Sequence, residues 1–357
     1  MNDGYREVIA AGAAERRNLF LTAASRMGTA VQNVEKDFWV CWTLDVLFHG
    51  LGQDIPRLLF KGGTSLSKAF ALIPRFSEDI DITVFRSDLG QEVSVAELEA
   101  LSGKKRRARL DSIKDACRAF IGGVFQERVS AVVQSMLGGA GVSDDSYRVR
   151  LDPQDPDGQT VLFWYPSATQ TSDYVRSAVK IEAGAKSALD PNVAATVRPY
   201  VAEDLPQIDL NVADITTVTA ERTFWDKVII LHGVRHWFEH RGELRHGGHR
   251  VSRHYYDVFR LLQSPIGPEV TSNARLALDC ASHARMFFNS PDLDLDEAVA
   301  GRFVPAPTAH MLDALRRDYE AMSGMIFGAV PPFEDVVTAI NQLEADLNPP
   351  ASRSSGT

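Results

Sequence analysis

Two aspartates separated by a single residue are the clearest candidates for chemistry in this sequence. Asp79 and Asp81 alternate with apolar residues in the stretch DIDITVF, residues 79–85. Successive side chains of a strand point to opposite faces, so a strand here directs both carboxylates to one face, with Cα atoms roughly 7 Å apart. Two such carboxylates repel each other, and a hard cation such as Mg²⁺, or Mn²⁺ in its place, relieves the repulsion because it favours oxygen ligands. The pair therefore predicts a metal site, with a solvated strand end as the plainer interpretation.

A double glycine precedes this strand and supplies the second part of the expected site. The apolar run at 58–60 is too short for a helix and predicts a strand, after which Gly62 and Gly63 permit a turn that side chains would obstruct. The backbone amides of Gly63, Thr64 and Ser65, opening a helix, would offer donors and a positive dipole end to a phosphate. A Gly-Gly pair alone indicates only a turn. Because it lies about fifteen residues before the aspartates, in the order strand, turn, helix, strand, it predicts a site for a metal ion and a nucleotide.

These residues resemble the signature of a known superfamily, the DNA polymerase beta type nucleotidyltransferases. The longer string, KGGTSLSK followed by RFSEDIDI, resembles the AbiEii/AbiGii toxin branch of that superfamily, which includes the MenT toxins of mycobacteria. Four further segments resemble motifs of the same branch: VEKDFWV at 34–40, ERTFWDK at 221–227, RHYYD at 253–257 and the segment 318–328. The resemblance thus covers roughly residues 30–345.

The resemblance implies an α/β (α+β) fold, in which a nucleotidyltransferase core with a small mixed sheet lies between N-terminal helices and a C-terminal helical domain. The sequence divides in the same way. We expect N-terminal helices in 1–50, the core in 51–215, the helical domain in 216–347 after a linker near 203–217, and a disordered tail in 348–357.

Local patterns predict further elements within these regions. Apolar periodicity indicates helices over 5–25 and 31–48 and a helical, charged region over 87–138. The stretch 139–158 is rich in Gly, Ser, Asp and Pro, which is typical of a loop, and strand patterns return at 161–165 and 174–183.

Three more residues are candidates for the site. Alternation in the strand over 174–183 places Glu182 on one face with Lys180. Glu182 either joins the two aspartates at the metal and assists the acceptor, or forms a salt bridge with Lys180. Lys227 lies on a predicted helix, where a lysine normally faces solvent, but the resemblance implies a ligand of the nucleotide phosphates. Asp257 is either an acid on a helix surface or, as the resemblance implies, a late active-site residue.

Three charged segments each have a structural and a functional interpretation. The triplet 35–37, on an otherwise apolar helix, is either a solvated face or a brace for the active site. The basic cluster at 104–109 is either solvated surface or a contact for a phosphate backbone. Three histidines recur every fourth residue, at His232, His236 and His240. That spacing permits zinc, but nearby arginines disfavour a dication, and a mobile, basic loop over 239–252 that contacts the substrate is the better interpretation.

Composition limits the class of protein. The chain has 357 residues, 45% of them hydrophobic, which is ordinary for a globular protein with a substantial core. No apolar run approaches the roughly 20 residues of a membrane span and the N-terminus lacks the apolar region of a signal peptide, so we expect a cytoplasmic protein without membrane contact. Cys41, Cys117 and Cys280 are widely spaced and are expected as buried, reduced thiols. The net charge of -9 argues against general coating of nucleic acid but leaves room for a local basic groove.

Together these features predict a Mg²⁺-dependent nucleotidyltransferase in which an acceptor hydroxyl attacks an NTP in line, receives the NMP and expels pyrophosphate. Asp79 and Asp81 would hold the metal, and Lys68, Lys227 and the amides of 63–65 would hold the triphosphate. The resemblance implies the toxin of a toxin-antitoxin or phage-defence pair, with a cognate antitoxin and an RNA acceptor such as the tRNA 3′ end. Transfer to a small molecule or a protein, and a catalytically silent nucleotide-binding protein, are the alternatives.

Overall fold

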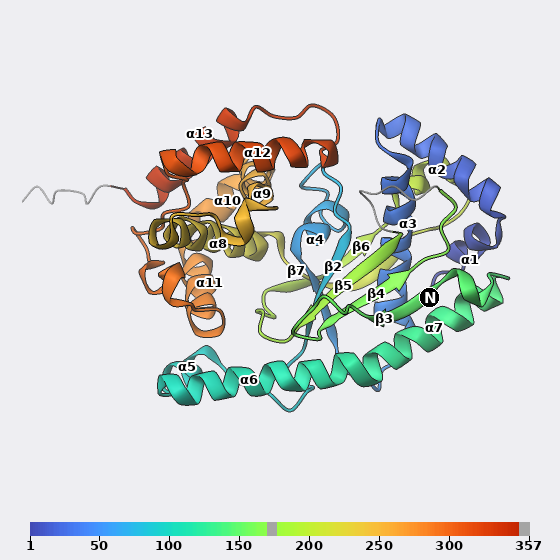
Figure 1. Cartoon of the computed structure of the whole chain (residues 1–357), viewed down its shortest axis with the longest axis horizontal. Coiled ribbons are helices and arrows are strands. Elements are labelled where there is room, and N and C mark those ends of the chain that lie inside the picture. Colours follow the sequence, from blue (N-terminus) through green and yellow to red (C-terminus); the bar gives the residue numbers. More distant parts are fainter. Residues whose placement is uncertain (170–176, 350–357) are drawn as a thin grey trace, which may run out of the picture. The chain divides into compact units, whose positions relative to one another are not determined.

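The computed structural model of the chain describes residues 1–169 and 177–349. The chain forms two compact units. The first comprises residues 1–71 and 75–218, and the second comprises 72–74 and the chain from 219 onward. Within the described residues the first unit carries all the strands and the second is helical (Figure 1).

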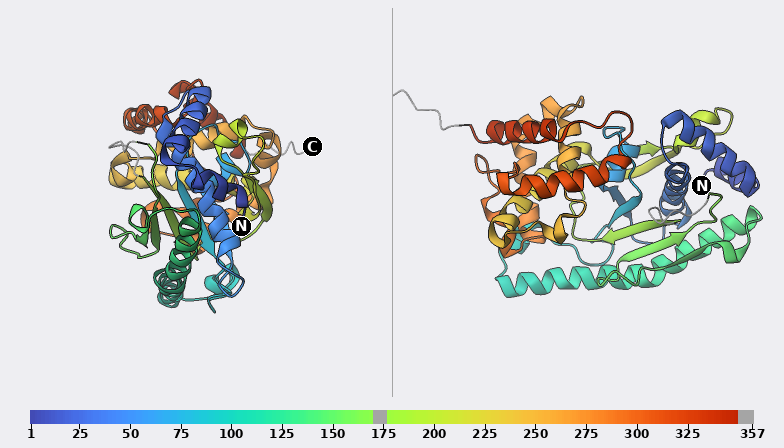
Figure 2. Two further views of the ribbon diagram at one scale, coloured as in Figure 1. Left: turned by 90° about the vertical axis from the view of Figure 1, so that its right-hand side faces the viewer. Right: turned by 45° about the horizontal axis from the view of Figure 1, so that its top comes forward.

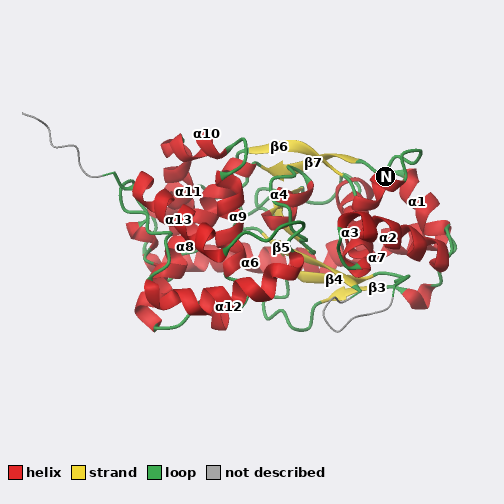
Figure 3. Cartoon of the chain, turned by 90° about the horizontal axis from the view of Figure 1, so that it is seen from above, coloured by secondary structure: helices red, strands yellow, loops and turns green. Residues whose placement is uncertain are grey.

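A mixed sheet of seven strands forms the centre of the first unit, counted over its described residues. The strands are β1 (Leu58–Lys61), β2 (Asp79–Val84), β3 (Arg148–Leu151), β4 (Thr160–Trp164), β5 (Ala178–Gly184), β6 (Asn192–Val197) and β7 (Val212–Val218). Their spatial order is β3-β4-β5-β2-β1-β7-β6, with β3 and β6 at opposite edges (Figure 3). Strand β2 pairs in parallel with β5 and antiparallel with β1, so the strand with the two aspartates lies in the middle of the sheet.

Seven α-helices accompany this sheet in the described part of the first unit. They are α1 (Asp3–Ala10), α2 (Ala13–Met27), α3 (Val31–Asp45), α4 (Gly62–Lys68), α5 (Val95–Glu99), α6 (Gly103–Phe120) and α7 (Gln126–Gly139). A turn of π-helix at Val46–Gly50 extends α3. A second one at Ile121–Phe125 joins α6 to α7, with a kink where Gly123 leaves the helical conformation (Figure 2). The active-site motif of the sequence thus becomes β1, the short helix α4 and β2.

Helix α3 is buried along almost its whole length. Every residue from Asn33 to Asp45 is buried. Trp39 stacks on Tyr165 with ring centroids 5.5 Å apart, and Trp42 lies 5.2 Å from Phe163 of β4. Large aromatic side chains bury much apolar surface and dominate the energetics of such a core. Helix α3 is therefore the central packing element against the sheet.

The alternation in β2 separates the two faces of the sheet. Ile80 pairs in register with Ile181 of β5, and Ile181 in turn pairs with Val161, two residues before Phe163. Partners in register point to the same face, so these apolar residues share the face that α3 covers. Asp79 and Asp81 point to the opposite face because they alternate with Ile80.

Several elements predicted from local pattern are confirmed. The strands expected at 58–60, 79–85 and 161–165, the helix after the double glycine and the helical character from 219 to 347 are all present. The strand expected at 174–183 corresponds to β5, which begins at Ala178; its first residues, 174–176, and residues 350–357 of the expected tail lie outside the described residues.

Three expectations are wrong. The helix expected over 5–25 is two helices, because the chain turns at Ala11 and Gly12 between α1 and α2. The loop expected at 139–158 contains β3, and the linker expected at 203–217 contains most of β7. Both strands exist through pairing with other strands, β3 with β4 and β7 with β1 and β6, which local composition does not indicate.

The second unit consists of α8 (Ala220–Arg241), α9 (Ser252–Leu262), α10 (Gly267–Ser272), α11 (Ala274–Phe287), α12 (Leu312–Met322) and α13 (Phe333–Leu347), with short 3-10 turns between them. Thr219 caps α8, its hydroxyl accepting from the Arg222 amide at 3.3 Å. The Phe327 amide donates to the Pro74 carbonyl at 2.9 Å, which ties segment 72–74 to this unit. None of the helices formed by residues 1–169 and 177–349 combines the length and the apolar character needed to cross a membrane.

Candidate active site

The sheet places three predicted carboxylates on one face of two adjacent strands. Asp79 and Asp81 share this face of β2, and Asp81 pairs in register with Glu182 of β5. Asp79 pairs in the same way with Lys180. The parallel pairing of β2 with β5 therefore brings together residues that lie about a hundred positions apart in the sequence. On the far side of β2, Lys61 of β1 is opposite Asp81.

Glu182 is at present paired with Lys180 rather than with the aspartates. The Lys180 ammonium donates to the Glu182 carboxylate, and both side chains are a little over one third exposed. Burial alone would lower the pKa of Lys180, but the hydrogen bond and charge of Glu182, together with the charges of Asp79 and Asp152, raise it. Over residues 1–169 and 177–349, no three His, Cys, Asp or Glu side chains converge closely enough to hold a metal ion. The expected third metal ligand, Glu182, is thus beside the aspartates without joining them.

The double glycine is explained by a close approach of Asp81. Gly62 has a φ of +83°, which favours glycine, and a Cβ added to it would lie 2.1 Å from Oδ2 of Asp81. A carboxylate can therefore rest directly against the backbone of the turn only because Gly62 has no side chain. The turn and the aspartate strand form one local structure.

Hydroxyl groups also link the turn to the aspartate strand. Thr64, at the start of α4, donates to the main-chain carbonyl of Asp79, and its oxygen lies 2.8 Å from the Ser77 hydroxyl. The Ser65 hydroxyl donates to the Gly62 carbonyl at 2.9 Å. The side chains of Thr64 and Ser65 thus stabilise the conformation of the turn in this structure.

Lys68 does not occupy the position expected of a triphosphate ligand. Its side chain is only 3% exposed, and its ammonium lies 2.7 Å from Oδ1 of Asp37 and 3.6 Å from the centre of the Tyr200 ring. Burial would lower the pKa of Lys68, but the adjacent carboxylate of Asp37 outweighs this effect and raises it, so the lysine stays charged. In this structure Lys68 anchors α4 to α3 and to Tyr200, and its binding of triphosphate stays a prediction.

The charged triplet of α3 is not a solvated face. Glu35, Lys36 and Asp37 are each at most 4% exposed. Glu35 accepts from the Ser167 hydroxyl at 2.8 Å and from the Ala168 amide at 2.5 Å. Lys36 forms a 2.7 Å ion pair with Glu78, the residue before Asp79, and Asp37 holds Lys68 at the end of α4. The alternative interpretation, a brace for the elements that carry the site, is the one that fits this geometry.

In the second unit, two predicted site residues form a buried ion pair. Lys227 of α8 lies 2.8 Å from Oδ2 of Asp257 on α9, and their side chains are 7% and 0% exposed. The alternatives of a solvent-facing lysine and a surface acid are therefore both wrong. The structure brings Lys227 and Asp257 together although the residues between them include the end of α8 and a 3-10 turn.

Comparison with known proteins decides the family. Residues 45–339, well over half of the chain, match the family described as "Nucleotidyl transferase AbiEii toxin, Type IV TA system". The chain belongs to this family. The matched range contains every predicted site residue. This AbiEii chain is accordingly a member of a family of nucleotidyltransferase toxins, which use an NTP substrate and occur in toxin-antitoxin systems.

Among solved structures, the AbiEii chain is similar to MenT4, a nucleotidyltransferase toxin from Mycobacterium tuberculosis H37Rv. The two share 13% sequence identity and a TM-score of 0.49, over 94% of this chain and 90% of that one. Comparison with curated proteins gives no match.

The three evenly spaced histidines of this AbiEii chain lie around Asp294 and Glu239 and form a cluster of acids and histidines rather than a metal site. His236 and His240 lie 3.3 Å and 2.8 Å from Oδ2 of Asp294, and His236 also lies 3.4 Å from Glu239. His232 is buried, with the Asp294 carbonyl 3.2 Å from one ring nitrogen and the Val304 amide 3.2 Å from the other. The segment 239–252 is partly helical, since it contains the end of α8 and a 3-10 turn at Arg245–Gly248.

The basic cluster at 104–109 occupies the first two turns of α6. Arg106 donates to the Leu98 carbonyl at 3.0 Å and Arg109 to the Glu92 carbonyl at 2.9 Å, so both support the preceding segment. Lys104, Lys105 and Arg107 are exposed. These three side chains are the part of the cluster that a polyanion can reach.

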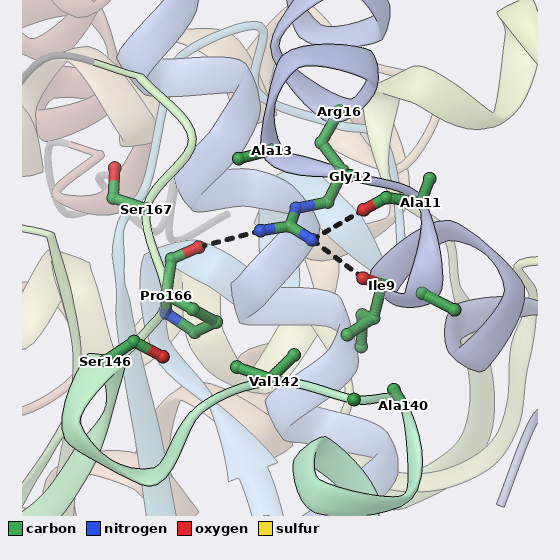
Figure 4. Close-up of a pocket in the computed structure, with 12 residues that line it drawn as sticks. Ile9, Ala11, Gly12, Ala13, Arg16, Ala140, Val142, Ser146, Pro166 and Ser167 are labelled. Carbon is green, nitrogen blue, oxygen red and sulfur yellow. Dashed lines mark hydrogen bonds between the residues drawn. The ribbon is translucent and has the colours of Figure 1, made fainter.

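A cavity of about 400 Å³ lies elsewhere in the first unit, at the junction of α1 and α2 (Figure 4). The Arg16 guanidinium crosses its wall and donates to the carbonyls of Ile9 and Ala11 at 2.7 and 2.9 Å, and to the Pro166 carbonyl at 3.4 Å. Its described lining includes none of the predicted site residues. Arg16 joins α1, α2 and the segment after β4, which is a structural role.

Three residues of the site were missed by sequence reasoning, although they lie inside the string RFSEDIDI. Arg75 lies against Gly63, Ser77 is linked to Thr64, and Glu78 is paired with Lys36. The signal available was their position between the turn and the aspartates. Nothing in the spacing of residue types distinguishes them from a polar loop.

Proposed function

We propose that this AbiEii chain transfers a nucleoside monophosphate from an NTP to the hydroxyl of an RNA, such as the tRNA 3′ end, and that this activity is the toxic one. The observation that carries the proposal is that Asp79, Asp81 and Glu182 lie on one face of two adjacent strands, next to the Gly62 turn against which Asp81 rests. Family membership supplies the reaction type. The acceptor is inferred from the sequence resemblance.

The donor set suits a hard divalent cation. Asp79 and Asp81 would hold Mg²⁺ or Mn²⁺, since Mg²⁺ is commonly bound by one or two carboxylates together with water and substrate phosphates. When bound, the metal would neutralise charge on the attacking and leaving oxygens. A third protein carboxylate is not required for this, which agrees with the pairing of Glu182 to Lys180.

The remaining residues have roles in binding and proton transfer. We assign Glu182 to the acceptor hydroxyl, whose proton it would accept as the acceptor oxygen bonds to the α-phosphorus and the bond to the β-phosphate breaks, releasing pyrophosphate. Lys227 would bind phosphate, with Asp257 fixing the position of its ammonium. The turn at 63–65 would bind the triphosphate.

The proposal is tested by following the label of each α-labelled NTP, with Mg²⁺, into RNA, protein and small molecules. Asp79→Asn and Asp81→Asn should abolish transfer in folded protein, and Asp54→Asn, at an exposed carboxylate, is the matched control. Glu182→Gln should lower kcat by about 100- to 10,000-fold, the usual contribution of a general base. Label in protein or in a small molecule would replace RNA as the acceptor, and no transfer with any NTP would leave a nucleotide-binding protein.

A growth experiment tests the toxin role and the place of action. Expression of the wild-type chain in the cytoplasm of a bacterial host should stop growth, and a cognate antitoxin should restore it. The Asp79→Asn chain, expressed to the same level, should not be toxic. Equal growth of the two would retain the enzyme and remove the toxin role in that host.

A further inference from the structure

Arg75 is a buried cation at the Gly63 turn that the proposed reaction has not yet used. The residue is 4% exposed, and its Nη1 donates to the Phe76 carbonyl at 3.2 Å. A Cβ added to Gly63 would lie 2.5 Å from its Nη2 and 3.5 Å from its Cζ. The guanidinium therefore occupies the space that any side chain at position 63 would need.

Side chains of opposite charge pack against the two glycines of the turn. Gly62 receives the carboxylate of Asp81, and the next residue, Gly63, receives the guanidinium of Arg75. This arrangement explains why two successive glycines are needed, since a methyl group at either position would displace a charged group. An arginine keeps its charge when it is buried, because the guanidinium holds its proton too tightly to lose it at neutral pH.

Burying a charge is costly unless the group is paired and hydrogen-bonded, so a buried guanidinium is held in a defined place by its surroundings. Ser77, two residues after Arg75, would lie 3.4 Å from the same added Cβ, and its hydroxyl contacts Thr64. Thr64 in turn donates to the Asp79 carbonyl. Arg75 thus sits at one end of a chain of contacts that runs through the turn to the strand of the aspartates.

We propose that Arg75 is a positioning residue for the NTP. Acting through Gly63, its planar guanidinium holds the turn in the conformation that receives the triphosphate, and its fixed positive charge favours the phosphates there. This rests on the proposed nucleotidyl transfer. A lysine keeps the charge but lacks the planar fork, so it replaces arginine only in part at such a site.

Steady-state kinetics of NTP use separate this role from simple packing. Arg75→Gln should raise KM for the NTP by about 10-fold or more, the usual effect of losing an interaction with a charged group, with a smaller change in kcat. Arg75→Lys should restore part of the loss. Arg57→Gln is the matched control, because Arg57 is 66% exposed and paired with Asp88, and its KM should equal that of wild type.

Gly63→Ala tests the same contact between Gly63 and Arg75 by changing the glycine instead of the arginine. Its Cβ must displace the guanidinium, so it should raise KM as Arg75→Gln does, and the double variant should be little worse than either single one. If Arg75→Gln does not fold, Arg75→Lys and Gly63→Ala carry the test. A folded Arg75→Gln or Gly63→Ala protein with KM within twofold of wild type, or additive effects in the double variant, would overturn the inference. A wild-type chain that transfers nothing would instead refute the proposed function.

Discussion

The buried ion pair of Lys227 and Asp257 allows the effect of a substitution on stability to be separated from its effect on activity. The two side chains are 7% and 0% exposed and lie 2.8 Å apart. Removing one side chain takes away the ion-pair partner of the other, which stays buried and charged. Replacing both with apolar residues of similar size leaves neither charge. The pair can therefore be removed with or without a large loss of stability.

The magnitudes follow from this burial. Lys227→Met or Asp257→Leu alone should lower the free energy of unfolding by about 3–5 kcal/mol, the usual cost of breaking a buried ion pair by removing one of its members. The double variant should lie within about 1 kcal/mol of wild type, since apolar replacement of a buried ion pair is often neutral or stabilising. Lys114→Met is the control. Lys114 pairs with Asp157 at the surface, where an ion pair contributes at most about 1 kcal/mol.

Urea denaturation and NTP transfer, measured on wild type, the two single variants, the double variant and the control, provide the assay. If Lys227 binds phosphate, the double variant is stable and inactive, and no stability argument explains its inactivity. A stable double variant with wild-type kcat/KM would refute the assignment and leave the pair as packing. If the double variant is as unstable as the sum of the two single variants, the two charges are not coupled and the reasoning from their burial fails.

Three further predictions use other parts of the chain. Gly62→Ala should cost about 1–2 kcal/mol through its left-handed backbone and abolish transfer by displacing Asp81, whereas Gly90→Ala, with φ +66° and open space around it, should carry the backbone cost alone. Burial lowers the pKa of His232 to about 4, so between pH 6.5 and 4 only the unfolded chain takes up its proton. Stability from this group, at most about 3 kcal/mol, is present above pH 6.5 and lost as the pH falls, and His232→Gln should remove that part of the pH dependence in parallel urea titrations. If RNA is the acceptor, replacing Lys104, Lys105 and Arg107 with glutamine should reduce the slope of log RNA affinity against log salt concentration by about one unit per lost phosphate contact, with NTP affinity unchanged. The control variant carries the same charge change at the exposed residues Arg6, Arg17 and Arg128. An unchanged slope would mean that the cluster is solvated surface.

The sequence predicts the centre of the fold better than its periphery, for a physical reason. The structure of segment 58–85 can be predicted from its own residues, because a short apolar run, a double glycine and an alternation of polar and apolar residues each indicate a local conformation. Strands β3 and β6 lie at the edges, and five of the six residues of β6 are half-buried or exposed without a simple alternation. Such strands are specified largely by their partners in the sheet, here the next strand of the chain in each case, and their own residue pattern does not reveal the pairing.

The same distinction applies to the site. Asp79 and Asp81 were predicted because alternation alone places them on one face, and their position on that face is what β2 shows. Lys68 was assigned to the triphosphate because it follows the turn, yet its partner is Asp37, thirty-one positions away. A lysine at the end of a short helix gives no sign of the buried carboxylate that will hold it. Residue type and spacing therefore identify the chemistry and leave open which charges face the substrate.

Helix α3 shows why those charges lie where they do. Three consecutive residues of a helix point in different directions, so one buried triplet can reach three different segments. Glu35 holds the chain at 167–168, Lys36 holds Glu78 beside the aspartates, and Asp37 holds Lys68 at the end of α4. Each contact involves a buried, charged side chain of α3, so breaking any one is more costly than losing an ion pair at the surface. The position of β2 relative to α4, on which the proposed metal and phosphate contacts depend, is thus braced by α3 in addition to the direct contacts of Thr64 with Ser77 and Asp79.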